Sequence, residues 1–376
     1  SGDQAVLFTA LSRVSAQAAE QLAKNGVTLR EYEDIYPFLS SLQTDAHVLC
    51  DPDEVNYLLY NQMQNNSHLT LVKGVDPIPM MKAVKNETEI ANTRLAYLKD
   101  GCAEAEFYGW LFEALEKGET VTEWKCSQKI AEFRAQQKHY VSESFTAIIA
   151  YRENAAMMHY APLPQACSTI ERENMLLNDS GGQYLEGTTD TTRTFAVGPI
   201  TDEERRDFTN ALKGVIALSR QRFLAGSTGS DLDTICRGQI WKEGLNYRCG
   251  TGHSVSFVGN VHEGPHALNG RNTTLMRPGM IVTDEPGVYE TDLVGIRIEN
   301  ELVCVHKADN QYGTFLGFEP LMFVPIATSP ILPGVLDKDE IAWLNDYHRQ
   351  VFAKLAPHLN DEERSWLAEK CAAIGC

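Results

Sequence analysis

Four acidic residues stand out, because they form two pairs that each flank a glycine-containing turn in strand-like sequence. Asp179 and Asp190 lie in LLNDSGGQYLEGTTDTTRTFAV, and Glu285 and Glu299 lie in GMIVTDEPGVYETDLVGIRIENELVCV. His253, in GTGHS, stands between the two runs. One such acid alone would ordinarily be a solvated loop residue. That interpretation does not suit all four, because Asp190 and Glu299 lie in strand-like runs, where an unpaired charge is costly. Oxygen ligands with one imidazole suit Mn, Fe(II), Co or Zn. The pattern therefore predicts a hydrolase with two metals ~3.5–4 Å apart.

Other titratable side chains near these acids leave alternatives open. His159 and His262 occur in strand-like or loop sequence, so each either faces a substrate or is inert. Arg193 and Arg297 are the cations nearest to the acids in the sequence. Arg297 shares a strand face with Glu299 by the period of two. It therefore either orients a ligand carboxylate or forms a surface ion pair.

A second metal motif is excluded by its own sequence. The segment HEGPH at 262–266 matches H-E-x-x-H, but that motif binds zinc only when both histidines project from one face of a helix. Proline lacks the N–H that a helix needs and clashes with the preceding turn. We therefore do not expect a zincin site here.

Composition limits the class of protein. The chain has 376 residues, of which 43% are hydrophobic and 22% charged, as in a globular protein of about two domains. A net charge of -18 argues against nucleic-acid binding. The sequence contains no apolar run of ~18 residues, so we expect no membrane helix. Its start does not have the pattern of a secretory leader. Nine cysteines without a CxxC pair indicate reduced thiols, so we expect a cytoplasmic location.

The elements that position the acids are predicted to occur twice. Helices are expected at 87–117 and 121–137, followed by strand-like runs, and the same order returns with helices at 201–224 and 230–243. The strand-like runs after the first pair of helices are 145–151, 157–160, 174–179 and 188–198. Those after the second pair are 254–258, 279–285, 295–300 and 301–305. Each helix–helix–hairpin unit, over 86–198 and 201–305, thus carries one pair of acids.

The two ends of the chain lie outside this duplication. Before residue 77 we expect helices at 7–25, 28–42 and 54–64 around a short strand within 47–53, a fragment of a larger α/β domain. After residue 318 a proline-rich stretch leads to helices at 339–355 and 361–374. The apolar stretch 318–335 either covers the catalytic domain or makes a dimer contact.

The motifs together resemble the pita-bread metallopeptidases and, within them, the Xaa-Pro aminopeptidases (aminopeptidase P). The matching runs are HYAP (159–162), NDSGGQYLEGTTDTTRTF (178–195), GTGHSV (250–255), VHEGP (261–265), TDEPGVYE (283–290) and GIRIEN (295–300). The resemblance covers about 77–370, and the tail looks like that of the three-domain branch. It implies an α+β pita-bread fold with two duplicated halves over 77–376, preceded at 1–76 by part of a second domain in an N-terminally truncated chain.

The resemblance also implies a ligand set. Asp179 would bind one metal, His253 and Glu285 the other, and Asp190 and Glu299 both. The metals would be two divalent ions. Mn²⁺ is the usual metal of the family, and Zn²⁺ and Co²⁺ are the alternatives. A hydroxide bridging them would attack the carbonyl before proline in a peptide that begins Xaa-Pro.

Further family roles fall on residues around that ligand set. Glu285 would shuttle the proton, and His159 and His262 would act in catalysis and bind substrate. Arg297 would contact the substrate as well. The resemblance favours a homodimer.

Two alternatives and two departures accompany this resemblance. A dipeptide-restricted prolidase, or a non-catalytic peptide-binding module, would share the fold, although all five ligand positions are intact here. Ser254 and Ser256 replace glycines of the family's GHGVG, so either this loop never used positive φ or the pocket is reshaped. The first domain of three-domain relatives is absent, so we expect metal binding with slow turnover.

Overall fold

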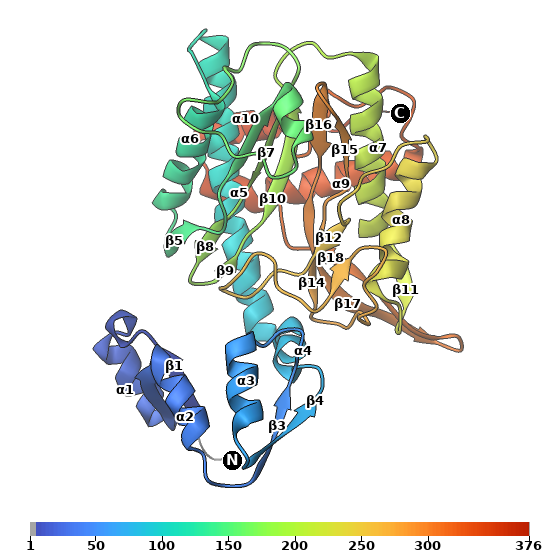
Figure 1. The fold of residues 1–376 in the computed structure, drawn as a ribbon. Helices are drawn as coiled ribbons and strands as arrows, with labels where there is room; N and C mark the ends of the chain where they lie inside the picture. Colours follow the sequence, from blue (N-terminus) through green and yellow to red (C-terminus); the bar gives the residue numbers. More distant parts are fainter. Residues whose placement is uncertain (1–4, 376) are drawn as a thin grey trace. The chain divides into compact units, whose positions relative to one another are not determined.

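The computed structural model describes residues 5–375, and the chain divides into two compact units after Ile78. Figure 1 labels their helices and strands. The elements of the first unit are β1 (Ala5–Thr9), α1 (Ala16–Lys24), β2 (Val27–Glu31), α2 (Ile35–Ser41), β3 (Ala46–Cys50), α3 (Tyr57–Asn65) and β4 (Leu69–Lys73). Strand β1 pairs in parallel with β2, and β3 pairs in parallel with β4.

The helices expected at 7–25 and 28–42 are wrong in their first parts. Residues 5–9 and 27–31 are strands that pair with each other across an intervening helix. The sequences AVLFT and VTLRE contain the β-branched and aromatic residues that favour strands. Helix α1 begins only after Ser15, whose side chain accepts a hydrogen bond from the Ala18 N–H.

The division after Ile78 falls within α4 (Pro77–Ala83), so the second unit begins inside this helix. Its first half comprises α5 (Glu87–Glu116), α6 (Glu123–Gln136), β5 (Tyr140–Glu143), β6 (Ile148–Tyr151), β7 (Met175–Ser180), β8 (Gly182–Tyr184), β9 (Gly187–Thr188) and β10 (Thr191–Ala196). The order in the main sheet of this half is β10-β7-β6. A capping box between Asn86 and Glu89 begins α5.

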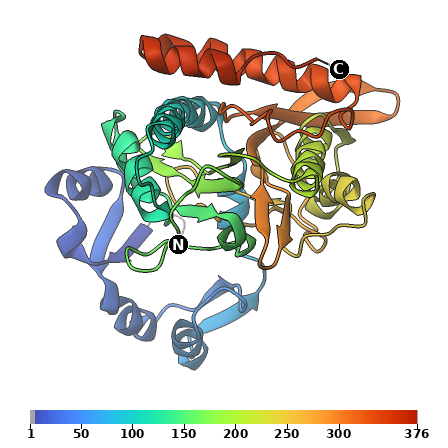
Figure 2. The ribbon, with the colours of Figure 1, turned by 90° about the horizontal axis from the view of Figure 1, so that it is seen from above.

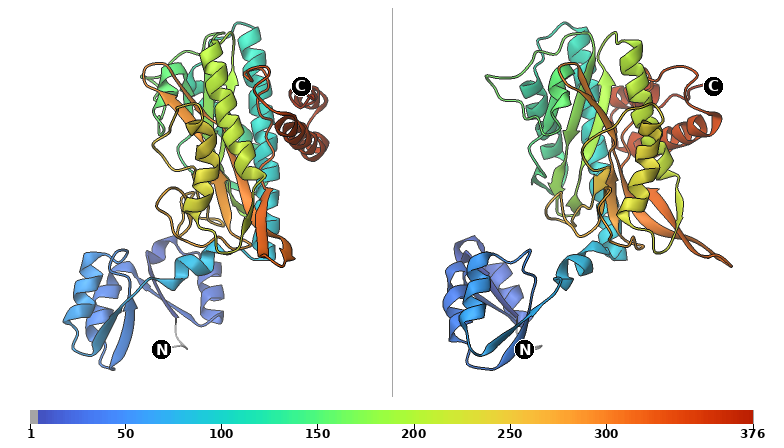
Figure 3. Two further views of the ribbon diagram at one scale, coloured as in Figure 1. Left: turned by 90° about the vertical axis from the view of Figure 1, so that its right-hand side faces the viewer. Right: turned by 45° about the vertical axis from the view of Figure 1, so that its right-hand side comes forward.

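The second half repeats the order of helix, helix and strands. It comprises α7 (Asp202–Ser219), β11 (Arg222–Leu224), α8 (Gly229–Trp241), β12 (Gly252–His253), β13 (Ala267–Leu268), β14 (Ile281–Asp284), β15 (Gly287–Glu290), β16 (Val294–Arg297), β17 (Asn300–Asn310) and β18 (Gly313–Pro320). Thr201 and Glu204 form the expected capping box of α7. The expected α+β arrangement is confirmed in both halves, and Figures 1 and 3 show β17 and β18 as a long projecting hairpin.

Three expected elements of the second unit differ from the structure. Helix α7 ends at Ser219, because residues 222–224 pair with β18 instead. The stretch 157–160 is a turn, and the strand expected at 254–258 is an irregular loop. In that loop the Ser256 N–H donates to the Asn260 carbonyl at 3.2 Å, which folds the chain back on itself.

The C-terminal stretch packs on the second unit itself. Residues 321–327 are buried and belong to the main hydrophobic core together with α9 (Lys338–Leu355) and α10 (Asp361–Lys370). Figure 2 shows these two helices along one side of the unit, next to α5 and α7. Of the two alternatives for 318–335, the structure therefore shows the first: within a single chain, this stretch covers the second unit. Helix α10 ends at Lys370, before the expected 374.

A buried histidine in α9 makes the stability of the fold depend on pH. His348 is fully buried, and its Nε2 accepts a hydrogen bond from the Ile326 N–H at 3.2 Å. Burial, and then nearby Arg193, lowers the pKa of His348 to about 4. The unfolded chain takes up this proton near pH ~6.5. The stability contribution is thus complete above that pH and is lost as the pH falls towards 4.

His348→Gln is expected to remove this pH dependence, because a glutamine amide oxygen can accept the same N–H without titrating. Between pH 7 and 4.5 the free energy of unfolding should fall by about 2 kcal/mol less in the variant than in the wild type. Urea unfolding at both pH values measures it, with exposed His306→Gln as the control. Parallel losses in all three proteins would contradict this role.

Candidate metal centre

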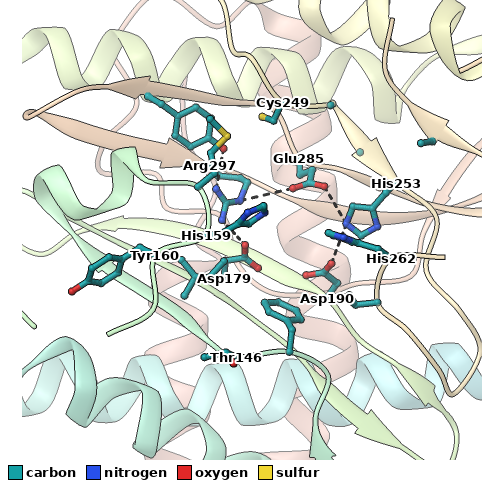
Figure 4. A pocket seen from close by; sticks show the side chains of 18 of the residues that line it. Thr146, His159, Tyr160, Asp179, Asp190, Cys249, His253, His262, Glu285 and Arg297 are labelled. Atoms are coloured by element: carbon teal, nitrogen blue, oxygen red, sulfur yellow. Dashed lines mark hydrogen bonds and ion pairs between the residues drawn. The ribbon is translucent and has the colours of Figure 1, made fainter. Parts of the chain in front are cut away.

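The predicted site residues other than Glu299 line one cavity of about 670 Å³ in the second unit. Figure 4 shows its labelled acids and histidines pointing towards one another. The lining residues are Phe145, Thr146, Ile148, Met158, His159, Tyr160, Ala161, Asp179, Asp190, Cys249, Gly250, Gly252, His253, Val261, His262, Ala267, Asn269, Glu285, Tyr289 and Arg297. The cavity wall therefore draws on both halves of the duplicated unit.

Three of the four predicted acids form a compact cluster. Asp179, Asp190 and Glu299 each offer a carboxylate oxygen, and these oxygens lie within 4.8 Å of one another. Asp179 is on β7, Asp190 immediately precedes β10, and Glu299 lies between β16 and β17. The two halves meet here because the Glu299 N–H donates to the Thr192 carbonyl at 3.2 Å and the Thr192 hydroxyl donates to Glu299 Oε2 at 2.8 Å.

His253 and Glu285 complete the group on the side of the second half. His253 Nε2 lies 3.3 Å from Glu285 Oε1 and 3.4 Å from Asp190 Oδ2. The Thr283 hydroxyl links the pair, since it accepts from the His253 N–H at 2.9 Å and contacts Glu285 Oε1 at 2.9 Å. A Cβ at Gly252 would lie 1.9 Å from the Thr283 carbonyl oxygen, so this close approach requires glycine.

Arg297 lies inside the centre and is only 3% exposed, so the alternative of a surface ion pair is wrong. Its guanidinium donates to Asp179 Oδ2 and, at 2.9 Å, to the Tyr289 hydroxyl. Its Nε donates to the Thr192 hydroxyl at 3.2 Å and lies 3.9 Å from Glu285 Oε2. Arg297 thus contacts two of the acids and can fix their orientation.

The electrostatics of the cluster favour a cation. Burial, followed by repulsion from neighbouring carboxylates, raises the pKa of Asp190 and Glu299 well above the usual range, and burial also raises that of Glu285. Asp179 Oδ1 and Glu299 Oε1 are buried without a hydrogen-bond partner among the described residues. A cation between such orphaned oxygens would take up their lone pairs and offset the repulsion between the carboxylates. The donor set fits hard divalent cations.

His262 and His159 line the same cavity without joining the acidic cluster. The ring of His262 packs edge-on against that of His253, with 3.9 Å between the ring centroids. Partial burial, together with nearby His253 and His159, lowers the pKa of His262 to about 4. A neutral imidazole at pH 7 can donate or accept one hydrogen bond to a substrate without carrying charge.

Two segments beside the centre, 254–256 and 262–266, have a non-helical backbone. Segment 262–266 is not helical, as expected, and His266 is a buried residue whose Nε2 contacts the Ile281 carbonyl at 2.9 Å. Neither Ser254 nor Ser256 has a positive φ. In this chain the loop therefore does not use positive φ at these two positions, as the first of the two alternatives requires.

Sequence reasoning missed the residues that hold the acids in place. Thr192, Thr283 and Tyr289 bond to acids or to Arg297, and the Tyr97 hydroxyl accepts from the Asp190 N–H at 3.0 Å. Tyr97 comes from α5, far away in the sequence. Only Thr192 and Thr283, two residues from Asp190 and Glu285 and so on the same strand face, carried a detectable pattern.

No helix within residues 5–375 is long and apolar enough to cross a bilayer.

Three family models match this chain. That of metallopeptidase family M24 matches residues 98–306, that of the C-terminal region of peptidase M24 matches 314–374, and that of the creatinase/prolidase N-terminal domain matches 1–89. Aminopeptidase P2 of Arabidopsis thaliana is 37% identical over 97% of this chain and 56% of its own length. A probable Xaa-Pro aminopeptidase P of Coprinopsis cinerea is 36% identical over 99% of this chain and 63% of its own.

Solved structures agree on the fold. An X-prolyl aminopeptidase from Caenorhabditis elegans, described as a cytosolic enzyme with a di-nuclear active site, superposes with a TM-score of 0.91 at 33% identity, over 98% of this chain and 62% of that one. The Xaa-Pro dipeptidase from Bacillus anthracis, 22% identical, gives 0.65 over 85% of this chain and 84% of that one. The expected pita-bread fold is thereby confirmed. The chain spans 56% to 63% of the length of the curated relatives named above.

Proposed function

Because the chain belongs to metallopeptidase family M24, we propose that it is a metalloaminopeptidase that releases the N-terminal residue from peptides with proline in second position. The observation that carries this proposal is the cluster of three buried carboxylates with His253 and Glu285 beside it, a group of which all but Glu299 line a cavity of about 670 Å³. The Xaa-Pro preference is supported by relatives named for that activity over nearly all of this chain.

The proposed ligand set assigns each side chain by its position in the cluster. Asp179 would bind one cation, His253 and Glu285 the second, and Asp190 and Glu299 both. Asp190 suits a shared role, because it lies in the carboxylate cluster and also 3.4 Å from His253 Nε2. When bound, two divalent cations supply a water of lowered pKa and polarise the scissile carbonyl. Mn²⁺ is proposed because four of the five ligands are carboxylates.

Glu285 is proposed to hold and return the proton of the attacking water. Its Oε1 is engaged by the Thr283 hydroxyl at 2.9 Å, while Oε2 has Arg297 Nε only at 3.9 Å. Oε2 is therefore the less engaged of the two oxygens and can accept a proton from a water within hydrogen-bond reach. We therefore assign the transfer to Oε2.

The histidines of the cavity are proposed to act on the peptide itself. His262, neutral at pH 7, would donate a hydrogen bond to the scissile carbonyl as charge develops on its oxygen. His159, on the same cavity wall, would contact the substrate near its amino terminus. Arg297 also lines the cavity and stays assigned to substrate contact, but its hydrogen bonds to Asp179, Tyr289 and Thr192 make positioning of Asp179 its principal role.

Arg297→Lys is expected to weaken divalent-cation binding by about 10- to 100-fold, because an ammonium cannot serve Asp179, Tyr289 and Thr192 at once. Titration of the metal-free chain with Mn²⁺ measures the affinity. Arg237→Lys is a matched control, since Arg237 is 8% exposed and paired with Asp233 on α8 outside the cavity. Equal affinities in the two variants would remove Arg297 from the centre.

The test of the function compares two peptides. The chain should cleave Arg-Pro-Pro after its first residue in the presence of Mn²⁺, and should lose this activity when a chelator removes the metal. Cleavage of Ala-Pro alone would favour a dipeptidase, an alternative with the same fold. Failure to cleave either peptide with metal bound would favour a non-catalytic peptide-binding module and would contradict the proposal.

Three further assignments belong to this proposal. A cytoplasmic location is supported by the cysteine composition and by the relative described as cytosolic. A homodimer is proposed on family resemblance. Residues 1–76 are proposed as part of a second domain ahead of a catalytic domain at 77–376, which agrees with the N-terminal family match over 1–89.

A further inference from the structure

Arg193 is a buried cation that the proposed chemistry does not use. It lies on β10, three residues after Asp190, and is 1% exposed. Within residues 5–375, no carboxylate forms an ion pair with it; its hydrogen bonds go to carbonyl, amide and hydroxyl oxygens. A buried charge is tolerated only when its donors are satisfied, so the identity of these acceptors indicates what the residue does.

One side of the guanidinium holds the backbone of Glu299. Its Nη1 donates to the Glu299 carbonyl and, at 2.9 Å, to the Thr192 carbonyl, which also accepts the Glu299 N–H. Its Nη2 donates to Asn300 Oδ1 at 3.0 Å. The peptide groups on both sides of the Glu299 side chain are therefore fixed against β10.

The other side of the guanidinium holds the C-terminal region. Its Nη2 lies 2.8 Å from both the Val324 carbonyl oxygen and the Tyr347 hydroxyl oxygen and shares its two protons among these and Asn300 Oδ1, while its Nε donates to the Pro325 carbonyl at 3.2 Å. The Tyr347 hydroxyl lies 3.0 Å from the Val324 carbonyl and 3.2 Å from Asn300 Oδ1, with only one proton to donate. Tyr347 on α9 thus connects the buried segment 321–327 to the residue that follows Glu299.

We propose that Arg193 is a positioning residue through which the C-terminal region fixes Glu299 for metal binding. The inference rests on the proposed function and gives the region after β18 a role within a single chain. Five N–H donors in a rigid fork reach three separate segments at once, which lysine cannot reproduce. If an acceptor is lost on the C-terminal side, Arg193 shifts and the Glu299 carbonyl loses its fixed partner. The effect therefore passes from α9 to the ligand without any contact between them.

Tyr347→Phe tests this role with a small change. It removes the hydroxyl that accepts from Arg193 and keeps the ring, which stacks on Trp343 with 5.4 Å between centroids. Tyr151→Phe is the matched control, because its hydroxyl is also bound to a backbone carbonyl, that of Glu173 at 2.9 Å, and its residue is 3% exposed. Mn²⁺ titration of the metal-free chains should give about tenfold weaker binding for Tyr347→Phe than for Tyr151→Phe.

Two further measurements separate positioning from general stability. Hydrogen exchange of the Glu299 amide in the metal-free chain should be faster in Tyr347→Phe than in the control, even where their Tm values agree. Arg193→Lys should weaken Mn²⁺ binding at least as much. Equal Mn²⁺ affinity and equal exchange in the two tyrosine variants, with a wild type that binds Mn²⁺, would overturn this role alone. A wild type that binds no Mn²⁺ would overturn the proposed function and this role with it.

Discussion

Glu299→Ala is expected to empty the whole centre and to lower kcat/KM for an Xaa-Pro peptide by on the order of 10³-fold, since loss of the several kcal/mol that metals supply amounts to about three factors of ten. Glu299 is 1% exposed and lies in the three-carboxylate cluster. If it serves both cations, its removal costs both of them, whereas loss of a terminal ligand such as Asp179 weakens mainly one. Metal analysis of the purified variant gives the number of bound ions directly.

The control for this variant is Glu301→Ala. Glu301 is also fully buried, and burial raises its pKa as it does for Glu299, but it lies outside the carboxylate cluster. The Glu301 variant should keep both metals. Removal of Glu299 also relieves repulsion among buried carboxylates, so the metal-free Glu299→Ala chain should unfold at a Tm no lower than that of the metal-free wild type. Two full metal equivalents in Glu299→Ala would contradict the shared ligand role.

His262→Ala is expected to keep both metals and to lower kcat by about 10²-fold, the usual effect of losing one donor to a developing oxyanion. His262 lines the cavity and packs edge-on against His253, but it is not among the clustered acids or their direct partners. Its loss should therefore change the rate and leave the metal count unchanged. Steady-state kinetics on Arg-Pro-Pro measures the first and metal analysis the second.

His139→Ala serves as the control for the His262 variant, because His139 pairs with Glu186 outside the cavity. Its kinetics should match the wild type. Wild-type kinetics in His262→Ala would remove His262 from the mechanism. Loss of metal in that variant would instead assign His262 a role in holding His253.

The second unit could be predicted from sequence much better than the first unit. The long helices α5 and α7 carry their own capping boxes and apolar periodicity, so local sequence determines them. Strands β1 and β2 are stable only because they pair with each other across α1, and periodicity within either stretch does not reveal such a partner. Likewise, residues 222–224 become a strand only because β18 is beside them.

The same distinction applies to the candidate site. The acids and His253 could be grouped from residue type and spacing, because a pair of hard cations needs several carboxylates. Spacing left the roles of His159 and His262 open, and only the family resemblance assigned them. The supporting partners of the acids could not be identified from the sequence, since Tyr97 and Tyr347 reach the centre only through the packing of α5 and α9. In the sequence, Arg193 and Arg297 are both simply cations close to the acids, and only Arg297 shares a strand face with one of them, Glu299. Their positions on β10 and β16 make one contact backbone carbonyls and the other contact carboxylates.

The most direct test of the proposed centre is a calorimetric titration of the metal-free wild-type chain with Mn²⁺, with Arg-Pro-Pro cleavage assayed at each point. The arrangement of Asp179, Asp190, His253, Glu285 and Glu299 predicts two equivalents per chain, with activity that rises as they bind. Saturation at fewer than two equivalents, or full cleavage by the metal-free chain, would contradict it.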